Sequence, residues 1–334
     1  MNKFQYIQAQ SVADALSRLG DDFNSAKIWA GGLDLIGEMK EYLIEPQTVV
    51  SISRLEELKG IQDTGGSLKI GAVTPLSDIA HHETVRQQYT VLAQAAASVG
   101  SPQIRHVGTL GGNLCQRPRC WYYRDEQIEC LKKGGSMCYS LTGRNAYHAI
   151  LGGGPCFIVH PSDCAPALIA LEAKITIQGM DGARQIPLEE FFVSPQVNWL
   201  RENILKPREL VTEIEIPVTA AKSTYIKFRE REGFDWALAS VAAALEFQGT
   251  ACAKASVVLG GVAPIPWRAK KTEAFLVGKE ITGDAARQAG ELAVDGAFPL
   301  SDNTEKVDIT KAIVQQAVLS LKPGTTAVET PLVY

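Results

Sequence analysis

The sequence predicts an α+β protein of two domains. Its 334 residues exceed what one hydrophobic core usually serves. Patterns typical of strands, such as 48–52 and 156–160, alternate along the chain with apolar, alanine-rich patterns typical of buried helices, such as 91–99. Asp181 and Gly182 mark a hairpin turn. The pattern changes and short polar residues accumulate between 217 and 222. We therefore expect a larger domain over 1–219 and a smaller α+β domain over 220–334.

The composition is that of an ordinary soluble globular protein, with 46% hydrophobic and 21% charged residues. A net charge of −4 provides no electrostatic basis for binding nucleic acid or an anionic membrane. No apolar run approaches the roughly 18 residues that a membrane span needs, so we expect none. The first residues carry neither a basic nor an apolar signal region, so we expect a cytoplasmic protein.

A pair of glycines follows a short apolar strand near the N-terminus. Residues 11–14 have the sequence of a helix capping box, and Gly20 ends that helix. The strand at 27–30 then runs directly into Gly31 and Gly32. Such a turn brings bare backbone N–H groups up to a ligand, as pyrophosphate sites do. The alternative is an ordinary turn, and without a Gly-x-Gly-x-x-Gly fingerprint a Rossmann fold is disfavoured.

A second glycine turn occupies 108–113, just after the segment 101–105. It combines the hydroxyl of Thr109, the amide of Asn113 and unobstructed backbone, which all suit phosphate or ribityl oxygens. The alternative is a tight turn with Asn113 in a left-handed conformation. If the chain had only one glycine turn, this alternative would be favoured. Because it has two, a cofactor site and a pair of ordinary turns have equal weight.

Cysteines gather around the second glycine turn. Six of the seven lie close together in sequence: Cys115, Cys120, Cys130, Cys138, Cys156 and Cys164. An odd, clustered set fits a reducing compartment and metal binding better than a disulfide scaffold. A glycine turn, a carboxylate at Asp163 and a thiol-rich loop, all close in sequence, suggest two adjacent cofactors and therefore electron transfer.

Four segments together resemble the medium, FAD-binding subunit of the xanthine dehydrogenase family of molybdenum hydroxylases. They are Ala30–Leu35, Ile104–Leu114, His160–Asp163 and Leu259–Pro264. The resemblance covers nearly the whole chain and implies a two-part FAD-binding domain of the PCMH type, followed by a flavoprotein C-terminal domain. The chain departs from the family at Leu33, where a small polar residue is usual, and at His106, where Asn is common. Leu33 can still offer its backbone N–H to the pyrophosphate.

The resemblance implies that FAD binds through both glycine turns and the segment that ends at Asp163. The implied FAD contacts are Ile28, Trp29, Ala30, Gly31, Gly32, Leu33, Asp34, Leu35, Ser101, Gly108, Thr109, Gly111, Gly112, Asn113, Ser162, Asp163 and Lys227. Asp163 would bind a ribityl or adenosine hydroxyl, although a carboxylate at a helix start is ordinarily a cap. Lys227 would lie near the flavin ring and stabilise its reduced form, or it is a surface lysine on an edge strand. The resemblance implies no other catalytic residue, and His160 is expected to be structural.

The insert at about 115–156 narrows the resemblance to one branch of the family. Residues 116–124 are most similar to the flavin subunits of bacterial molybdenum aldehyde oxidoreductases. In these subunits, and in that of 4-hydroxybenzoyl-CoA reductase, such an insert holds a [4Fe–4S] cluster. The resemblance implies the cluster ligands Cys120, Cys130, Cys138 and Cys156. One thiolate per iron is the usual ligation of such a cluster.

Basic residues accompany the cysteines and would lower their pKa values and balance the charge of a cluster. They are Arg117, Arg119, Arg124, Lys132 and Lys133. One alternative is a zinc site, for which only Cys115 and Cys120 have a suitably close spacing; the other is a set of free structural thiols. Cys115, Cys164 and Cys252 are expected to be small core residues, although either of the first two could replace a proposed ligand.

The resemblance implies an FAD- and [4Fe–4S]-carrying electron-transfer subunit of a heterotrimeric molybdenum-dependent oxidoreductase, with an aldehyde oxidoreductase favoured. Its partners would be a large molybdenum-cofactor subunit, a small [2Fe–2S] subunit and an external electron acceptor. The alternatives are a subunit of a 4-hydroxybenzoyl-CoA reductase-like or xanthine dehydrogenase-like enzyme, a self-sufficient flavin oxidase, and a zinc-binding interaction module. A signal-bearing partner could also carry this chain to the periplasm. The substrate pocket would belong to another chain, so this sequence assigns no substrate.

Overall fold

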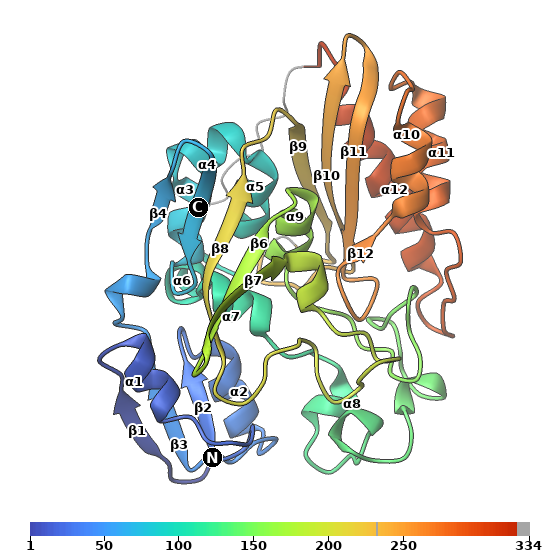
Figure 1. The fold of residues 1–334 in the computed structure, drawn as a ribbon. Coiled ribbons are helices and arrows are strands. Elements are labelled where there is room, and N and C mark those ends of the chain that lie inside the picture. The colour runs from blue at the N-terminus through green and yellow to red at the C-terminus, as the bar shows by residue number, and fades with distance from the viewer. Residues whose placement is uncertain (232, 326–334) are drawn as a thin grey trace.

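The computed structural model describes residues 1–231 and 233–325, and three β-sheets organise them. Figure 1 shows the sheet nearest the N-terminus at the lower left, the central sheet above it, and the third sheet beside a stack of helices at the upper right. The cysteine-rich insert lies at the lower right, beneath the third sheet. Within the described residues, no helix has both the length and the apolar character needed to cross a membrane.

The first sheet is parallel and has the strand order β1-β3-β2. Its strands are β1 (Gln5–Gln8), β2 (Ala26–Trp29) and β3 (Thr48–Ser51), and its helices are α1 (Val12–Ser17) and α2 (Leu33–Lys40). One half of the expected capping box forms: the Ser11 hydroxyl accepts a hydrogen bond from the backbone N–H of Asp14 at 3.1 Å. The Asp14 carboxylate accepts from the N–H of Gln10, at 3.0 Å, in place of that of Ser11. β2 leads through the first glycine turn into α2, as expected.

The central sheet is antiparallel, in the order β4-β5-β8-β6-β7. Its strands are β4 (Ile61–Asp63), β5 (Ser67–Gly71), β6 (Lys174–Gly179), β7 (Gly182–Pro187) and β8 (Leu210–Pro217). The helices of this part are α3 (Leu76–His81), α4 (Glu83–Gln88), α5 (Thr90–Ala97), α6 (Pro102–Val107), α7 (Leu110–Cys115) and α9 (Cys164–Ala170). The apolar residues expected to form a buried helix do so in α5, where Val91, Leu92 and Ala95 are fully buried. The predicted hairpin turn at Asp181 and Gly182 joins β6 to β7.

The third sheet is antiparallel and has the strand order β12-β11-β10-β9. Its strands are β9 (Lys222–Phe228), β10 (Ala239–Gln248), β11 (Ala251–Gly260) and β12 (Trp267–Arg268), and its helices are α10 (Lys270–Leu276), α11 (Gly283–Ala293) and α12 (Glu305–Ser320). Both faces are covered: α10 and α12 contact the sheet on one side, and α5 and α9 contact it on the other. Val257 and Leu259 accordingly belong to the C-terminal core, whereas the intervening Val258 belongs to the core of the central sheet.

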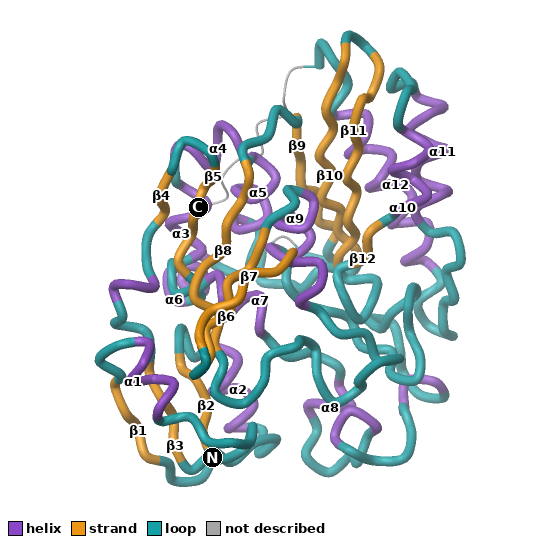
Figure 2. The backbone as a smooth tube through the Cα atoms, in the orientation of Figure 1, coloured by secondary structure: helices purple, strands orange, loops and turns teal. Residues whose placement is uncertain are grey.

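The insert between α7 and α9 contains little regular structure, as the loop colouring of Figure 2 shows. It has only the short helix α8 (Trp121–Arg124) and 3₁₀ turns at Leu131–Lys133 and Tyr139–Leu141; further 3₁₀ turns lie at Glu56–Leu58 and Leu188–Phe191. The sequence predicts a strand at 156–160, and this prediction is wrong. That segment bonds to other loops instead: the Phe157 carbonyl accepts from Ala149, and the His160 N–H donates to Ala263.

Candidate functional site

The first glycine turn lies against the backbone that leads into the second one. A Cβ atom on Gly31 would lie 2.2 Å from the carbonyl oxygen of Val107, well inside any allowed contact. Gly32 has a left-handed φ of 73°, and a Cβ atom there would lie 2.5 Å from the Trp29 ring. Both positions therefore require glycine, and they hold the two turns together.

The second turn is equally constrained, but its polar side chains already have partners. A Cβ atom on Gly111 would lie 2.9 Å from the Cβ atom of Ala72. The Thr109 hydroxyl caps α7 by accepting from the N–H of Gly112 at 3.2 Å. What this turn offers to a ligand is therefore chiefly its backbone.

The two turns line one cleft of about 530 Å³, a size within the range of roughly 300 to 1,000 Å³ for ligand pockets. Predicted FAD contacts that line it are Ile28, Ala30, Gly31, Gly32, Leu33, Asp34, Leu35, Gly108, Thr109, Gly111, Gly112 and Asn113. Two others lie beside the cleft: Trp29 packs edge-on to Tyr6, with ring centroids 6.1 Å apart, and Ser101 caps α6. The structure thus places residues from two turns that are far apart in the sequence around one cleft.

The remaining predicted FAD residues form a buried cluster with one another. The Ser162 hydroxyl donates to Asn113 Oδ1 at 2.5 Å. Asp163 accepts from the Tyr225 hydroxyl at 2.6 Å and pairs with Lys227 Nζ at 2.8 Å. The side chains of Asp163 and Lys227 are each only 4% exposed, so Lys227 is not a surface lysine. Burial and the Asp163 carboxylate raise the pKa of Tyr225 well above its usual value.

A second pocket of about 220 Å³ shares lining residues with the cleft and borders the cysteine-rich insert. Ser162 and Asp163 line it on one side, and Cys120 and His148 line it on another. Both cavities are lined by Arg119, Asp235 and Trp236, with the Arg119 guanidinium 4.6 Å from the centre of the Trp236 ring. The sequence offered no signal for His148 or Trp236, because neither belongs to a motif.

The four cysteines expected to bind a cluster are unpaired thiols that lie near one another. The Cys138 and Cys156 thiols are hydrogen-bonded, and this contact lowers the pKa of Cys138 to about 5. Cys120 lies within electrostatic range of Cys130 and Cys138, and burial raises its pKa to about 11. Among the described residues, no three Cys, His, Asp or Glu side chains are arranged to hold a single metal ion.

The other three cysteines lie in apolar surroundings. Cys164 and Cys252 are fully buried in the central and C-terminal cores. Cys115 packs against the central core beside the cleft, and burial raises its pKa to about 12.

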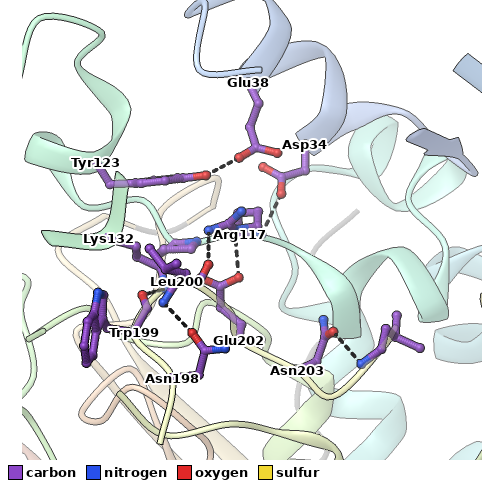
Figure 3. A network of polar contacts seen from close by, with 12 residues as sticks. Asp34, Glu38, Arg117, Tyr123, Lys132, Asn198, Trp199, Leu200, Glu202 and Asn203 are labelled. Atoms are coloured by element: carbon purple, nitrogen blue, oxygen red, sulfur yellow. Dashed lines mark hydrogen bonds and ion pairs between the residues drawn. The ribbon is translucent and has the colours of Figure 1, made fainter. Parts of the chain in front are cut away.

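Asp34 connects the first glycine turn to the insert. Its carboxylate accepts from the Arg117 N–H at 2.6 Å and forms ion pairs with Arg119 at 2.9 Å and Arg124 at 2.7 Å. Figure 3 shows Asp34 and Glu38 side by side on α2, with Glu38 bonded to the Tyr123 hydroxyl. Asp34 thus lines the cleft, but its carboxylate oxygens bind residues of the insert.

Glu202 holds the opposite side of the insert. It forms ion pairs with Arg117, at 2.7 Å, and with Lys132. These two cations also donate to the backbone carbonyls of Leu200 and Trp199, as Figure 3 shows. Sequence reasoning missed Glu202, because it lies in a loop without a motif.

Two family models match consecutive parts of the chain. The model described as "FAD binding domain in molybdopterin dehydrogenase" matches residues 2–219, and "CO dehydrogenase flavoprotein C-terminal domain" matches 223–319. The chain belongs to the FAD-binding medium subunits of the molybdenum hydroxylase family. The resemblance seen in the sequence and the predicted fold class are thereby confirmed.

Relatives match over almost their entire length. The aldehyde oxidoreductase FAD-binding subunit PaoB of Escherichia coli K12 is 34% identical, over 93% of this chain and 96% of that protein. The carbon monoxide dehydrogenase medium chain of Hydrogenophaga pseudoflava is 28% identical, over 95% and 94%. The solved quinoline 2-oxidoreductase of Pseudomonas putida 86 has a chain that superposes with a TM-score of 0.75 at 26% identity, covering 96% of this chain and 97% of that one.

The close approach of the two turns predicts that Gly31→Ala weakens FAD binding by tenfold or more, which is about 1.4 kcal/mol, because the new methyl group forces the turns apart. Flavin content after purification and titration of the apoprotein with FAD measure this effect. Gly37→Ala, on the helix α2 that follows the turn, is the control, since its Cβ atom would meet nothing closer than 3.7 Å. Equal FAD affinity in the two variants would contradict the prediction.

The Asp34 contacts predict that Asp34→Asn lowers the free energy of unfolding by about 1 to 3 kcal/mol, because Arg119 and Arg124 lose their ionised partner. Urea denaturation measures the loss. Glu41→Gln is the control: Glu41 pairs with the same Arg124, at 3.2 Å, but its side chain is 43% exposed. An equally small loss in both variants would argue against Asp34 as the link.

Because His160 is buried, we predict that the protein loses stability as the pH falls. The Ser162 N–H donates to its Nδ1 at 3.3 Å, and burial lowers the pKa of His160 to about 4. Between pH 4 and the ordinary value near 6.5, the unfolded chain binds a proton that the folded chain does not, so the free energy of unfolding falls as pH falls through that range. Urea denaturation measures the free energy of unfolding at pH 7 and at pH 5. The loss between these two pH values should be smaller in His160→Gln than in the control His106→Gln, because His106 is exposed.

Proposed function

We propose that this subunit carries FAD and a [4Fe–4S] cluster and transfers electrons within a heterotrimeric molybdenum-dependent aldehyde oxidoreductase. The observation that carries the proposal is that the two cavities share lining residues. Arg119, Asp235 and Trp236 line both the cleft at the glycine turns and the second pocket, which Cys120 also lines. A cofactor that spanned both would reach from a pyrophosphate cradle to the thiol-rich loop.

The glycine turns fit the pyrophosphate of FAD. At Gly31 and Gly32, side chains are excluded by Val107 and Trp29, so the backbone is the surface that faces the cleft. The N–H groups at the start of α2 have no partners within the helix and favour a negative charge. Leu33 contributes only its backbone here, in keeping with its departure from the small polar residue of the family.

Asp163 fits the flavin end of FAD, although its carboxylate is paired with Lys227, which lines neither cavity. Asp163 borders the second pocket, and Tyr225 and Lys227 hold its carboxylate in one orientation. A carboxylate oriented in this way can still accept a hydrogen bond from a ribityl hydroxyl, because each oxygen has two lone pairs. Lys227 then acts as a fixed positive charge behind Asp163.

The insert offers four thiols for a cluster. Cys120, Cys130, Cys138 and Cys156 come from separate loop segments, and none of them is in a disulfide bond. A [4Fe–4S] cube takes one thiolate on each of its four irons. We therefore assign these four as ligands and leave Cys115, Cys164 and Cys252 as core residues.

FAD supplies a centre that exchanges electrons one at a time with iron–sulfur clusters and in pairs with an external acceptor. The residues of this chain bind and orient it and exclude water: the glycine turns hold one end, and Asp163 and Arg119 border the other. The substrate would be oxidised in a large molybdenum-cofactor subunit, and a small [2Fe–2S] subunit would connect the two.

An aldehyde is the proposed substrate class of the complex. The 34% identity to an aldehyde oxidoreductase FAD-binding subunit supports it, together with the similarity of residues 116–124 to that branch of the family. The complex is proposed to work in the cytoplasm, or in the periplasm if a partner subunit carries the export signal.

Metal and flavin analysis of the purified complex tests the proposal. We expect one FAD and one [4Fe–4S] cluster in this subunit, molybdenum and [2Fe–2S] clusters in its partners, and aldehyde oxidation only by the assembled complex. Aldehyde oxidation by this subunit alone would instead indicate a self-sufficient flavin oxidase. Zinc in place of iron after anaerobic purification would indicate an interaction module.

The ligand assignment predicts that Cys156→Ser removes the cluster and leaves FAD bound, because the serine hydroxyl does not replace a thiolate on iron. Iron content and the low-temperature EPR spectrum of the dithionite-reduced subunit measure the cluster. Cys252→Ser is the control, since this buried thiol lies in the C-terminal core, away from the insert. Unchanged iron content in Cys156→Ser would rule out the proposed ligand set.

A further inference from the structure

The carboxylates around the insert offset its basic residues only in part. Arg117 and Lys132 share Glu202, and Arg119 and Arg124 share Asp34, with Glu41 also pairing with Arg124. Of these cations, Lys132 lies within electrostatic range of Cys156. A buried cation from another part of the chain would add to this positive charge.

Lys306, on α12 of the C-terminal domain, is a buried cation without an ionic partner among the described residues. It is only 1% exposed. Its ammonium donates to two backbone carbonyls, that of His148 at 2.8 Å and that of Gly261 at 2.7 Å. No carboxylate of the described residues lies within 4.0 Å of it. Carbonyl dipoles satisfy its hydrogen bonds, but they do not neutralise its charge.

The carbonyl that Lys306 binds belongs to the residue that touches a proposed cluster ligand. His148 Nε2 lies 3.2 Å from the Cys120 sulfur. Asn303, one turn before Lys306, donates to the same His148 carbonyl at 3.1 Å and to the Asn145 carbonyl at 3.2 Å. The C-terminal domain thus fastens this part of the insert with one charged and one neutral side chain.

A buried ammonium with only dipolar partners is unfavourable unless a negative charge lies near it. Burial accordingly lowers the pKa of Lys306 to about 7. Four thiolates around a [4Fe–4S] core give that centre a net negative charge, which would interact strongly with a cation in so poorly solvated a place. Hydrogen bonds and charges near a cluster are among the features that set its reduction potential.

We infer that Lys306 is a positioning residue that holds the His148 loop against Cys120 and supplies the counter-charge that raises the reduction potential of the cluster. The inference rests on the proposed [4Fe–4S] site. A positive charge favours the reduced, more negative form of a cluster, so loss of the charge should move the potential to a more negative value.

The test is an EPR-monitored redox titration of the holo complex. Lys306→Met should keep the cluster and shift its potential to a more negative value, whereas Lys306→Arg should stay near the wild-type potential. Lys311→Met, on the same helix but partly exposed and paired with Glu291, should not shift it. Asn303→Leu removes the neutral donor to the same carbonyl. It therefore distinguishes an effect of loop position from an effect of charge, because only loss of the charge should move the potential substantially.

Each outcome is decisive. An unshifted potential in Lys306→Met, or an equal shift in Asn303→Leu, would overturn the role of the charge. If Lys306→Met does not assemble the cluster, assembly by Lys306→Arg supports the inference, and failure of both variants overturns it in favour of a purely steric role. Absence of a cluster signal in the wild-type complex would instead refute the proposed function before any variant is compared.

Discussion

The close contact between the two glycine turns is the constraint on which the rest of the site depends. Gly31 rests directly on the backbone at Val107, so the small parallel sheet cannot separate from the helices of the central sheet without losing this contact. The cleft between them exists because neither turn carries a side chain at the point of contact. At that point the surface of the cleft is backbone, which suits a phosphate.

The insert has little secondary structure of its own, and buried polar contacts on three sides hold it in place. Asp34 fastens it to the helix that follows the first glycine turn, and Glu202 fastens it to the loop between β7 and β8. Asn303 and Lys306 fasten it to the C-terminal domain. The flavin cleft and the thiol-rich loop are thus parts of one polar network, and a change in one should be felt by the other.

The third sheet explains why the two domains behave as one framework. Both of its faces are buried, one under its own helices and one against α5 and α9. Lys227, on β9, reaches across this contact to Asp163 and to the carbonyl of Ser98. The C-terminal domain therefore contributes directly to the site beside the cleft, by an ion pair that is almost completely buried.

Local sequence determined the elements whose causes are local. The Ser11 N-cap, the hairpin at Asp181 and Gly182, and the first glycine turn, where Gly32 has a positive φ, follow from local conformations that few residues allow, so short motifs suffice to predict them. The second glycine segment has no positive φ, and a tertiary contact with Ala72 is what requires Gly111. The strand predicted at 156–160 failed because its neighbours are loops, which no β-pattern reveals. Tertiary structure alone decided that Asp34 pairs with the arginines of the insert, that Glu202 pairs with two of its cations, and that Lys306 comes to lie beside His148. Such contacts depend on which side chains folding brings within a few ångströms, and residues far apart along the chain leave no trace of them in local sequence.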